Sequence, residues 1–229
     1  MIAHVNGVDL FYEKTGQGRP LVMVHGNGED HTIFDEAVEV LRERFTCYCV
    51  DSRSHGQSTE AGELHYEDMA EDMIAFMEEL DLRNVAFYGF SDGGIVGLLT
   101  APRCDRITTL VVSGANLSHK GVKKYLTYAL KVLYLFKKDP KIQLMLQEPN
   151  IPEEYVRKIT IPTLVLAGSK DLILEQETRR IAAAIPGAEL RILDGEGHGS
   201  YIVHKNTIAK ILLDYLSEET KKPEEEIES

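Results

Sequence analysis

The chain has 229 residues and a mass of 25.7 kDa, a length that suits one large domain with a sizeable core. Apolar residues make up 43% and charged residues 27%, which disfavours wholesale disorder, collagen-like repeats and a coiled coil. A net charge of −12 opposes nucleic-acid binding, and no apolar run approaches the ~18 residues needed to cross a bilayer. The N-terminus lacks the basic and apolar blocks of a signal peptide, so we expect a cytoplasmic protein without stable membrane insertion.

Apolar runs bounded by turn signals alternate with longer segments of helical period, a pattern that predicts βαβ units in a mostly parallel sheet. Asn6-Gly7 is a strong hairpin signal, so the chain is expected to open with two antiparallel strands. The predicted strands are Ile2 to Val5, Val8 to Tyr12, Pro20 to Val24, Phe45 to Val50, Val85 to Phe90, Ile107 to Ser113, Thr163 to Ala167 and Glu189 to Leu193. The predicted helices include Thr32 to Phe45, Tyr66 to Leu80, Glu175 to Ile185 and His204 to Leu216.

The segment from Gly114 to Pro162 interrupts this alternation, because 49 residues are too many for an ordinary loop. We interpret it as an inserted cap or lid. Its stretch from Ser118 to Lys141 carries seven lysines against one aspartate, with apolar side chains interleaved at Leu126, Leu130, Leu133 and Phe136. The pattern predicts an amphipathic helix whose apolar stripe packs over the core while its lysines face water. A surface for an anionic or lipid-like substrate and a homodimer contact through the cap are the alternatives.

The expected domain organisation is therefore a core formed by residues 1–113 and 163–216 with the cap, 114–162, inserted between them. The remaining residues, 217–229, contain six glutamates and almost no apolar side chains. Such a composition predicts a disordered acidic tail, to which we assign no function.

A glycine-rich turn follows the strand that ends at Phe90. Gly89 to Gly94 contains a G-x-S-x-G motif, and the apolar run Ile95 to Leu99 follows at once with helical character. A serine on a tight strand-to-helix turn needs small neighbours, which glycine supplies. This context predicts that Ser91 is an exposed nucleophile at the carboxyl edge of the sheet.

A serine hydroxyl is a weak nucleophile at neutral pH and requires a histidine base with a carboxylate to orient it. His198 lies in a glycine-rich loop after the last predicted strand, and Asp171 follows the strand before it. The chain order of serine, acid and base is the one expected for this arrangement. Asp194 and Glu196 are rival acids, but they are too close to His198 in sequence to reach the far side of its ring easily.

Acyl transfer also needs backbone N–H donors for the oxyanion. The residue after the nucleophile, Asp92, supplies one, and the loop His25-Gly26-Asn27-Gly28 after the third strand supplies a second, which we place at Asn27. A phosphate-binding loop at this position is disfavoured because no G-x-x-x-x-G-K follows.

The remaining histidines and the cysteines give no metal or thiol signal. His31 either lines the mouth of the site or simply begins a helix, and the others are expected in surface or turn positions: His4, His55, His65, His119 and His204. Cys47 and Cys49 alternate within one apolar run, so both should point to one core face as reduced thiols, and Cys104 has no histidine partner signal. We expect no metal and no cofactor.

These features together resemble the α/β-hydrolase superfamily, in its serine esterase and lipase-like branch, from Met1 to about Leu216. The match includes Asp51 to Ser58, which looks like the family's D-x-R-G-x-G-x-S with Ser54 where glycine is usual. The resemblance implies an α/β-hydrolase fold: an eight-stranded, mostly parallel sheet with helices on both faces and a short inserted cap. It also carries the nucleophile, acid, base and oxyanion positions over to Ser91, Asp171, His198, Asn27 and Asp92.

The implied activity is cleavage of a small-molecule carboxylic ester through an acyl-enzyme intermediate. C–C bond hydrolysis, thioester cleavage and acyl transfer use the same triad and remain open, because substrate choice depends on cap and pocket side chains. A non-catalytic binding protein is a further alternative, although no catalytic group is missing from the pattern.

Overall fold

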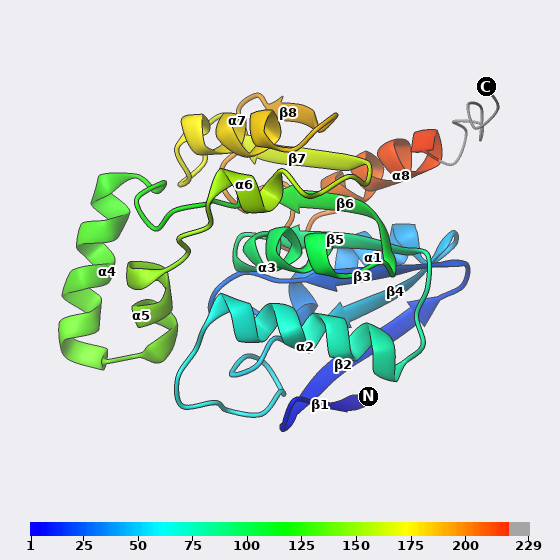
Figure 1. Cartoon of the computed structure of the whole chain (residues 1–229), viewed down its shortest axis with the longest axis horizontal. Helices are drawn as coiled ribbons and strands as arrows, with labels where there is room; N and C mark the ends of the chain where they lie inside the picture. Colours follow the sequence, from blue (N-terminus) through cyan, green and yellow to red (C-terminus); the bar gives the residue numbers. More distant parts are fainter. Residues whose placement is uncertain (220–229) are drawn as a thin grey trace.

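The computed structural model describes residues 1–219 and shows one eight-stranded sheet covered by helices on both faces (Figure 1). The strand order is β1-β2-β4-β3-β5-β6-β7-β8, with β1 and β2 antiparallel to their neighbours and the remaining pairs parallel. The strands are β1 (Ile2–Val5), β2 (Val8–Gly16), β3 (Arg19–Val24), β4 (Phe45–Val50), β5 (Val85–Phe90), β6 (Ile107–Ser113), β7 (Thr163–Gly168) and β8 (Glu189–Leu193). The predicted antiparallel opening and parallel remainder are confirmed.

The helices follow the strands in the expected alternation. They are η1 (His31–Phe34), α1 (Asp35–Leu41), α2 (Tyr66–Glu79), α3 (Asp92–Thr100), η2 (Ala101–Arg103), α4 (Lys124–Lys137), α5 (Pro140–Gln147), α6 (Glu153–Val156), α7 (Glu175–Ala184) and α8 (Thr207–Glu219). The prediction of one helix from Thr32 to Phe45 was wrong in two respects. The segment begins as a 3₁₀ turn capped by Asp30, whose carboxylate accepts from Thr32 N, and the helix ends at Leu41, because three turn residues lead into β4.

A different set of helices packs against each face of the sheet. Consecutive side chains of a strand point to opposite faces and so contact different helices. Val22 and Val24 of β3 pack on the side of α2, α3 and α7, whereas Leu21 and Met23 pack with α1 and α8. The predicted orientation of the cysteines follows the same rule, since Cys47 and Cys49 both lie in the α1 and α8 cluster. Burial raises the pKa of the Cys47 thiol to about 12.

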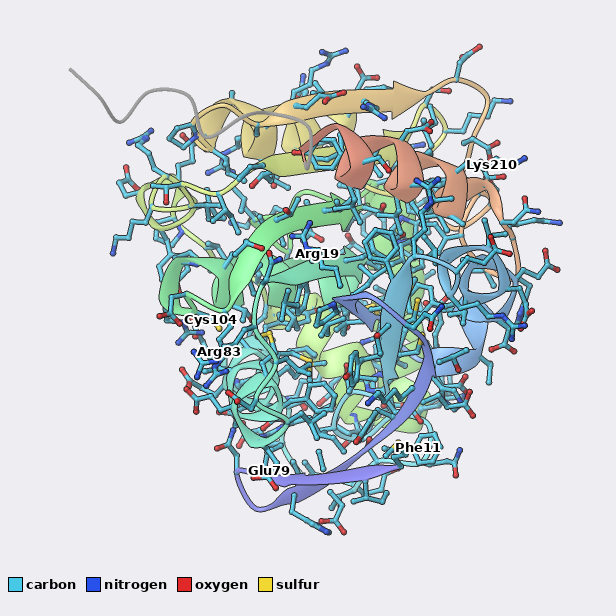
Figure 2. The ribbon with its side chains drawn as sticks, turned by 90° about the vertical axis from the view of Figure 1, so that its right-hand side faces the viewer. Phe11, Arg19, Glu79, Arg83, Cys104 and Lys210 are labelled. Atoms are coloured by element: carbon cyan, nitrogen blue, oxygen red, sulfur yellow. The ribbon has the colours of Figure 1, made fainter. Side chains whose placement is uncertain are left out.

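The cap segment, residues 114–162, separates β6 from β7 and contains α4, α5 and α6. Helices α4 and α5 project beyond the sheet at one end of the molecule, while α6 lies against the body (Figure 1). Val156 of α6 is fully buried in the main core. Figure 2 looks onto the opposite end, where β3 starts at Arg19 and α8 carries Lys210.

The C-terminal expectations are met only in part. The predicted helix from His204 begins later, because His204 has a φ of 49° in the turn that precedes α8. Helix α8 extends to Glu219, so the first three residues of the expected tail are helical. The rest of that tail lies outside the described residues. Within the described part of the chain, no helix combines the length and apolarity that crossing a membrane demands.

Candidate active site

The carboxyl ends of five neighbouring parallel strands supply the loops of the candidate site. Strands β3, β5 and β6 end together, since Val24 pairs with Gly89 and Phe90 with Ser113. Loops after these strands and after β7 and β8 therefore meet at one edge of the sheet. This is the arrangement that the strand order predicted for Ser91, Asp171 and His198.

Ser91 occupies the sharp turn between β5 and α3 with φ 54° and ψ −113°, a strained conformation for a residue with a side chain. The turn is possible because its flanking glycines leave room for other backbone. A Cβ on Gly89 would lie 2.1 Å from Gly93 O, and one on Gly93 would lie 2.1 Å from Val24 O. The two glycines of the motif thus explain how the turn holds the serine above the sheet edge.

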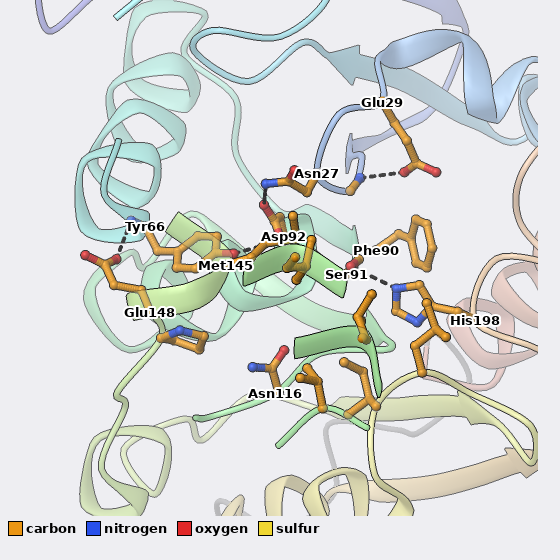
Figure 3. Close-up of a pocket in the computed structure, with 17 residues that line it drawn as sticks. Asn27, Glu29, Tyr66, Phe90, Ser91, Asp92, Asn116, Met145, Glu148 and His198 are labelled. Carbon is orange, nitrogen blue, oxygen red and sulfur yellow. Dashed lines mark hydrogen bonds between the residues drawn. The ribbon is translucent and has the colours of Figure 1, made fainter. Parts of the chain in front are cut away.

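His198 connects Ser91 to Asp171. Its Nε2 lies 3.0 Å from Ser91 Oγ (Figure 3), and its Nδ1 lies 2.6 Å from Asp171 Oδ1. The imidazole also contacts the Phe90 ring, with centroids 5.0 Å apart. With an ionised Asp171, Nδ1 carries the proton and Nε2 is left to accept from the serine hydroxyl.

Asp171 is buried yet held in its charged form. Burial opposes ionisation, but the hydrogen bond and charge of His198 and the backbone N–H groups of Ile173 and Gly168 outweigh it. The pKa of Asp171 is consequently lower than its ordinary value. The rival acids lie elsewhere: Asp194 contacts Ser169, and Glu196 accepts a hydrogen bond from Ser200.

The two expected oxyanion donors border the same cavity as Ser91. Asp92 begins α3, so its N–H has no acceptor within the helix. The next amide, Gly93 N, donates to His25 O at 3.0 Å and ties the nucleophile turn to the loop that contains Asn27. Asn27 and Asp92 are therefore adjacent in space.

The Asp92 side chain has a structural role that the sequence did not reveal. It is buried and accepts hydrogen bonds from Asn27 Nδ2 at 2.9 Å and from Tyr66 Oη at 2.8 Å (Figure 3). Burial raises its pKa, against the opposing effect of these two donors. Asn27 Nδ2 also lies 3.2 Å from Lys141 O of α5, so one amide links the oxyanion loop, the nucleophile turn and the cap.

Two further acids border the cavity and were also missed. Glu29 Oε2 accepts from Gly26 N at 3.0 Å, and burial raises the pKa of this carboxyl. Glu148 accepts from Tyr66 N and contacts His65 Nδ1 at 2.7 Å. No sequence pattern connects Tyr66 with Glu148, because they are 82 positions apart and come from the body and the cap.

The cavity has a volume of about 210 Å³ and lies between the nucleophile turn and the cap. Its wall combines the polar groups described above with apolar side chains from the cap and from the loop that follows β7: Val122, Leu126, Leu130, Met145, Leu172 and Ile173. Two backbone hydrogen bonds join the cap to this loop, one from Lys123 N to Leu172 O and one from Leu174 N to Gly121 O.

The predicted apolar stripe of the cap divides into two parts. Leu126 and Leu130 face the cavity, as expected for residues that cover the site. Leu133 and Phe136 do not pack over the core and are 39% and 83% exposed, so this part of the prediction was wrong. Helix α4 extends past the body of the protein, and its second half packs against α5, where Tyr134 Oη donates to Gln143 Oε1 at 2.8 Å.

The buried His25 forms hydrogen bonds within the loops next to the site, whereas two other buried histidines have different surroundings. His25 donates from Nδ1 to Gly26 O and accepts from Ser52 N at Nε2, and burial lowers its pKa to about 4. His55 lies in a turn, as expected, but is buried with its ring 5.1 Å from that of His25. His31 is also buried and does not line the cavity.

Among residues 1–219, one cluster has metal-type ligands: Asp30, His31 and Asp51 bring possible donor atoms within 4.8 Å of one another. The Asp51 carboxylate already accepts from His31 N, from Gln57 N and from the His31 ring. These hydrogen bonds hold the loop after β4, so we interpret the cluster as structural.

Comparisons with known proteins decide the family. A sequence profile described as the alpha/beta hydrolase fold matches residues 19–145. The chain belongs to the α/β-hydrolase family. The AB hydrolase superfamily protein YisY of Bacillus subtilis is 27% identical to it, covering 91% of this chain and 95% of that protein. The serine hydrolase BPHL of Mus musculus is 26% identical, covering 93% of this chain and 84% of that protein.

The solved structures agree on the fold. The enol-lactonase from Burkholderia xenovorans superposes with a TM-score of 0.78 at 22% identity, covering 95% of this chain and all of that chain. As an α/β-hydrolase the protein is an enzyme of hydrolase type, which the sequence analysis predicted.

Proposed function

We propose that this α/β-hydrolase cleaves a small carboxylic ester through an acyl-enzyme, with Ser91 as nucleophile, His198 as base and Asp171 as its orienting acid. The observation that carries the proposal is the continuous chain of hydrogen bonds from Ser91 Oγ through His198 to Asp171 at the wall of the cavity. A serine bonded to a base that is itself oriented by a third group is the signature of nucleophilic catalysis.

The mechanism follows from the positions of these atoms. Ser91 Oγ attacks the ester carbonyl carbon while His198 Nε2 takes the hydroxyl proton, and the ionised Asp171 stabilises the resulting imidazolium. The backbone N–H groups of Asn27 and Asp92 receive the oxyanion. His198 then protonates the leaving alcohol, and a water activated by the same nitrogen releases the acid and restores Ser91.

The size and lining of the cavity support a small substrate. A volume of about 210 Å³ between apolar cap residues and the nucleophile accommodates a short acyl chain better than a long one. The apolar side chains Leu126 and Leu130 give that chain a surface to contact.

A p-nitrophenyl ester series from acetate to decanoate, run on the wild type and on Ser91→Ala, tests the proposal. We expect turnover to be highest for short chains and the variant to lose on the order of 10⁴-fold or more in kcat. Ser217→Ala, on α8 and outside the cavity lining, controls for the loss of a serine hydroxyl away from the site, and a fluorophosphonate probe reports whether Ser91 is activated. Labelling at Ser91 without turnover of any ester would contradict ester hydrolysis and favour C–C or acyl-transfer chemistry, whereas failure of both would contradict the triad itself.

A further inference from the structure

The outward side of α4 carries a concentration of exposed apolar side chains. Among the described residues, six of the nine large apolar side chains that are exposed belong to this one helix. Five of them form what we term the α4 outer face: Tyr125, Tyr128, Val132, Leu135 and Phe136. The sixth, Leu133, follows Leu130 by three residues and lies toward the inner side of the helix. Soluble proteins seldom leave so many neighbouring apolar side chains in water unless another surface covers them.

The spacing of these residues makes the face continuous. Tyr125, Tyr128, Val132 and Leu135 follow one another at intervals of three, four and three residues, so they form one stripe along the helix, with Phe136 beside its end. The opposite side of the helix is already used, because Leu126 and Leu130 line the cavity. Helix α4 therefore has two apolar sides, of which only the inner one is covered.

The charged side chains of α4 itself are all lysines. Lys124, Lys131, Lys137 and Lys138 lie on or next to α4 and are exposed, and from Ser118 to Lys138 the sequence contains no acidic residue. The whole chain nevertheless has a net charge of −12, so the rest of the molecule is strongly acidic. An anionic surface would attract the cap and repel the body, which orients the protein with α4 foremost.

The position of α4 in the fold allows such contact. Figure 1 shows it at the outermost edge of the molecule, with α5 between it and the body. A flat surface can thus approach the α4 outer face without meeting the acidic body first. Exposed aromatic and aliphatic side chains beside lysines are the composition of helices that lie in a membrane interface.

We propose that the α4 outer face docks on an anionic lipid bilayer, with its apolar stripe in the interface and its lysines at the headgroups. A second copy of the chain fits less well, because a two-fold contact brings the same patch of both copies together and so places lysines against lysines. An acidic soluble protein would satisfy the lysines but leaves the length of the apolar stripe unexplained. The proposal does not depend on the triad chemistry.

Co-sedimentation of the full chain with vesicles tests the proposal. We expect binding to vesicles of phosphatidylcholine with about 30% phosphatidylglycerol, little binding to phosphatidylcholine alone, and loss of binding at about 0.5 M NaCl. Leu135→Ser/Phe136→Ser and Lys124→Glu/Lys131→Glu should each weaken the partition at least tenfold. Lys205→Glu/Lys210→Glu makes the same charge change near and on α8 and should bind as the wild type does; Lys210 lies on the end of the molecule shown in Figure 2.

Circular dichroism and thermal melting establish that each variant is folded. The proposal is overturned if the wild type does not bind anionic vesicles, or if the lysine variant binds as strongly as the wild type. It is also overturned if light scattering shows a dimer that dissociates in Leu135→Ser/Phe136→Ser, because a second copy would then cover the face. Binding to soluble polyglutamate without binding to vesicles would overturn it in favour of an acidic protein partner.

Discussion

Asn27 and Asp92 are joined by a hydrogen bond of 2.9 Å from the amide Nδ2 to the carboxylate Oδ2. Each residue also provides one of the proposed oxyanion N–H groups, so this side-chain bond fixes the separation of two backbone donors. Preorganised donors are effective only where their positions are fixed before the reaction.

Replacing Asn27 by alanine keeps the backbone N–H but removes this bond. The buried Asp92 loses one of its two side-chain donors, which costs about 1–3 kcal/mol, and the loop is freed from the nucleophile turn. We expect kcat for a short ester to fall roughly 10- to 100-fold with KM changed much less. Asn150→Ala, an exposed asparagine of the cap, is the matched control and should stay within about twofold of wild type. Wild-type kcat in folded Asn27→Ala would contradict this function of the bond.

His25 predicts a pH dependence of stability. Burial lowers its pKa to about 4 in the folded protein, below its ordinary value of 6.5, so the unfolded chain binds a proton first as the pH falls. Stability is therefore unaffected by this group above about 6.5 and is lost as the pH falls from 6.5 toward 4, by up to about 3 kcal/mol.

Urea unfolding between pH 7.5 and pH 4.5 checks this prediction. The free energy of unfolding of His25→Asn should fall less steeply over that range than that of the wild type, although its value at pH 7.5 is lower because the bonds to Gly26 and Ser52 are changed. His4→Asn alters an exposed histidine and should reproduce the wild-type slope. Equal slopes for wild type and His25→Asn would show that His25 is not the group responsible.

Arg53 and Asp72 form a buried pair that holds the loop after β4 to α2. Arg53 Nε and Nη2 donate to the two oxygens of Asp72 at 2.6 and 2.7 Å, and Asp72 is 1% exposed. Arg53→Met leaves that buried carboxylate without its charged partner and with Asn6 Nδ2 as its remaining side-chain donor, which should cost about 3–5 kcal/mol of the free energy of unfolding. Arg83→Met, at an arginine exposed on the end shown in Figure 2, should cost less than about 1 kcal/mol. If both variants lose a similar amount of the free energy of unfolding, the buried pair does not stabilise the fold more than the exposed one.

The sequence predicted the parts of the fold that depend on local pattern. Five of the strands have the predicted bounds: β1, β4, β5, β6 and β8. Three of them, β4, β5 and β6, are buried parallel strands, which are short apolar runs between turn residues. Ser91, Asp171 and His198 could be grouped because each follows a strand, and parallel strands end at the same edge. Their hydrogen bonds have the expected order, with no carboxylate nearer in sequence bound to His198.

The parts that could not be predicted depend on contacts between distant segments. Tyr66 was expected only as the start of a helix, yet its hydroxyl reaches Asp92 and its backbone N–H reaches Glu148 of the cap. The exposure of Phe136 was missed for a related reason. Helical periodicity identifies an apolar side of a helix, but it does not say whether another element of the same chain covers that side.

The acids around the cavity predict discrimination against anionic esters. Glu29, Asp92 and Glu148 line the cavity, and among its described lining residues His198 is the one basic side chain. A negative charge on the acyl chain, about 4–8 Å from a carboxylate at an effective dielectric of ~20, is repelled by about 2–4 kcal/mol.

We expect kcat/KM for the p-nitrophenyl monoester of glutaric acid to be at least about tenfold below that of p-nitrophenyl valerate, which has the same chain length. Glu148→Gln should narrow this difference, because the amide keeps an oxygen for Tyr66 N and removes one charge. Glu154→Gln removes an exposed carboxylate from α6 and should leave it unchanged. Equal or faster hydrolysis of the glutarate ester would show that the acyl chain does not experience the field of these acids.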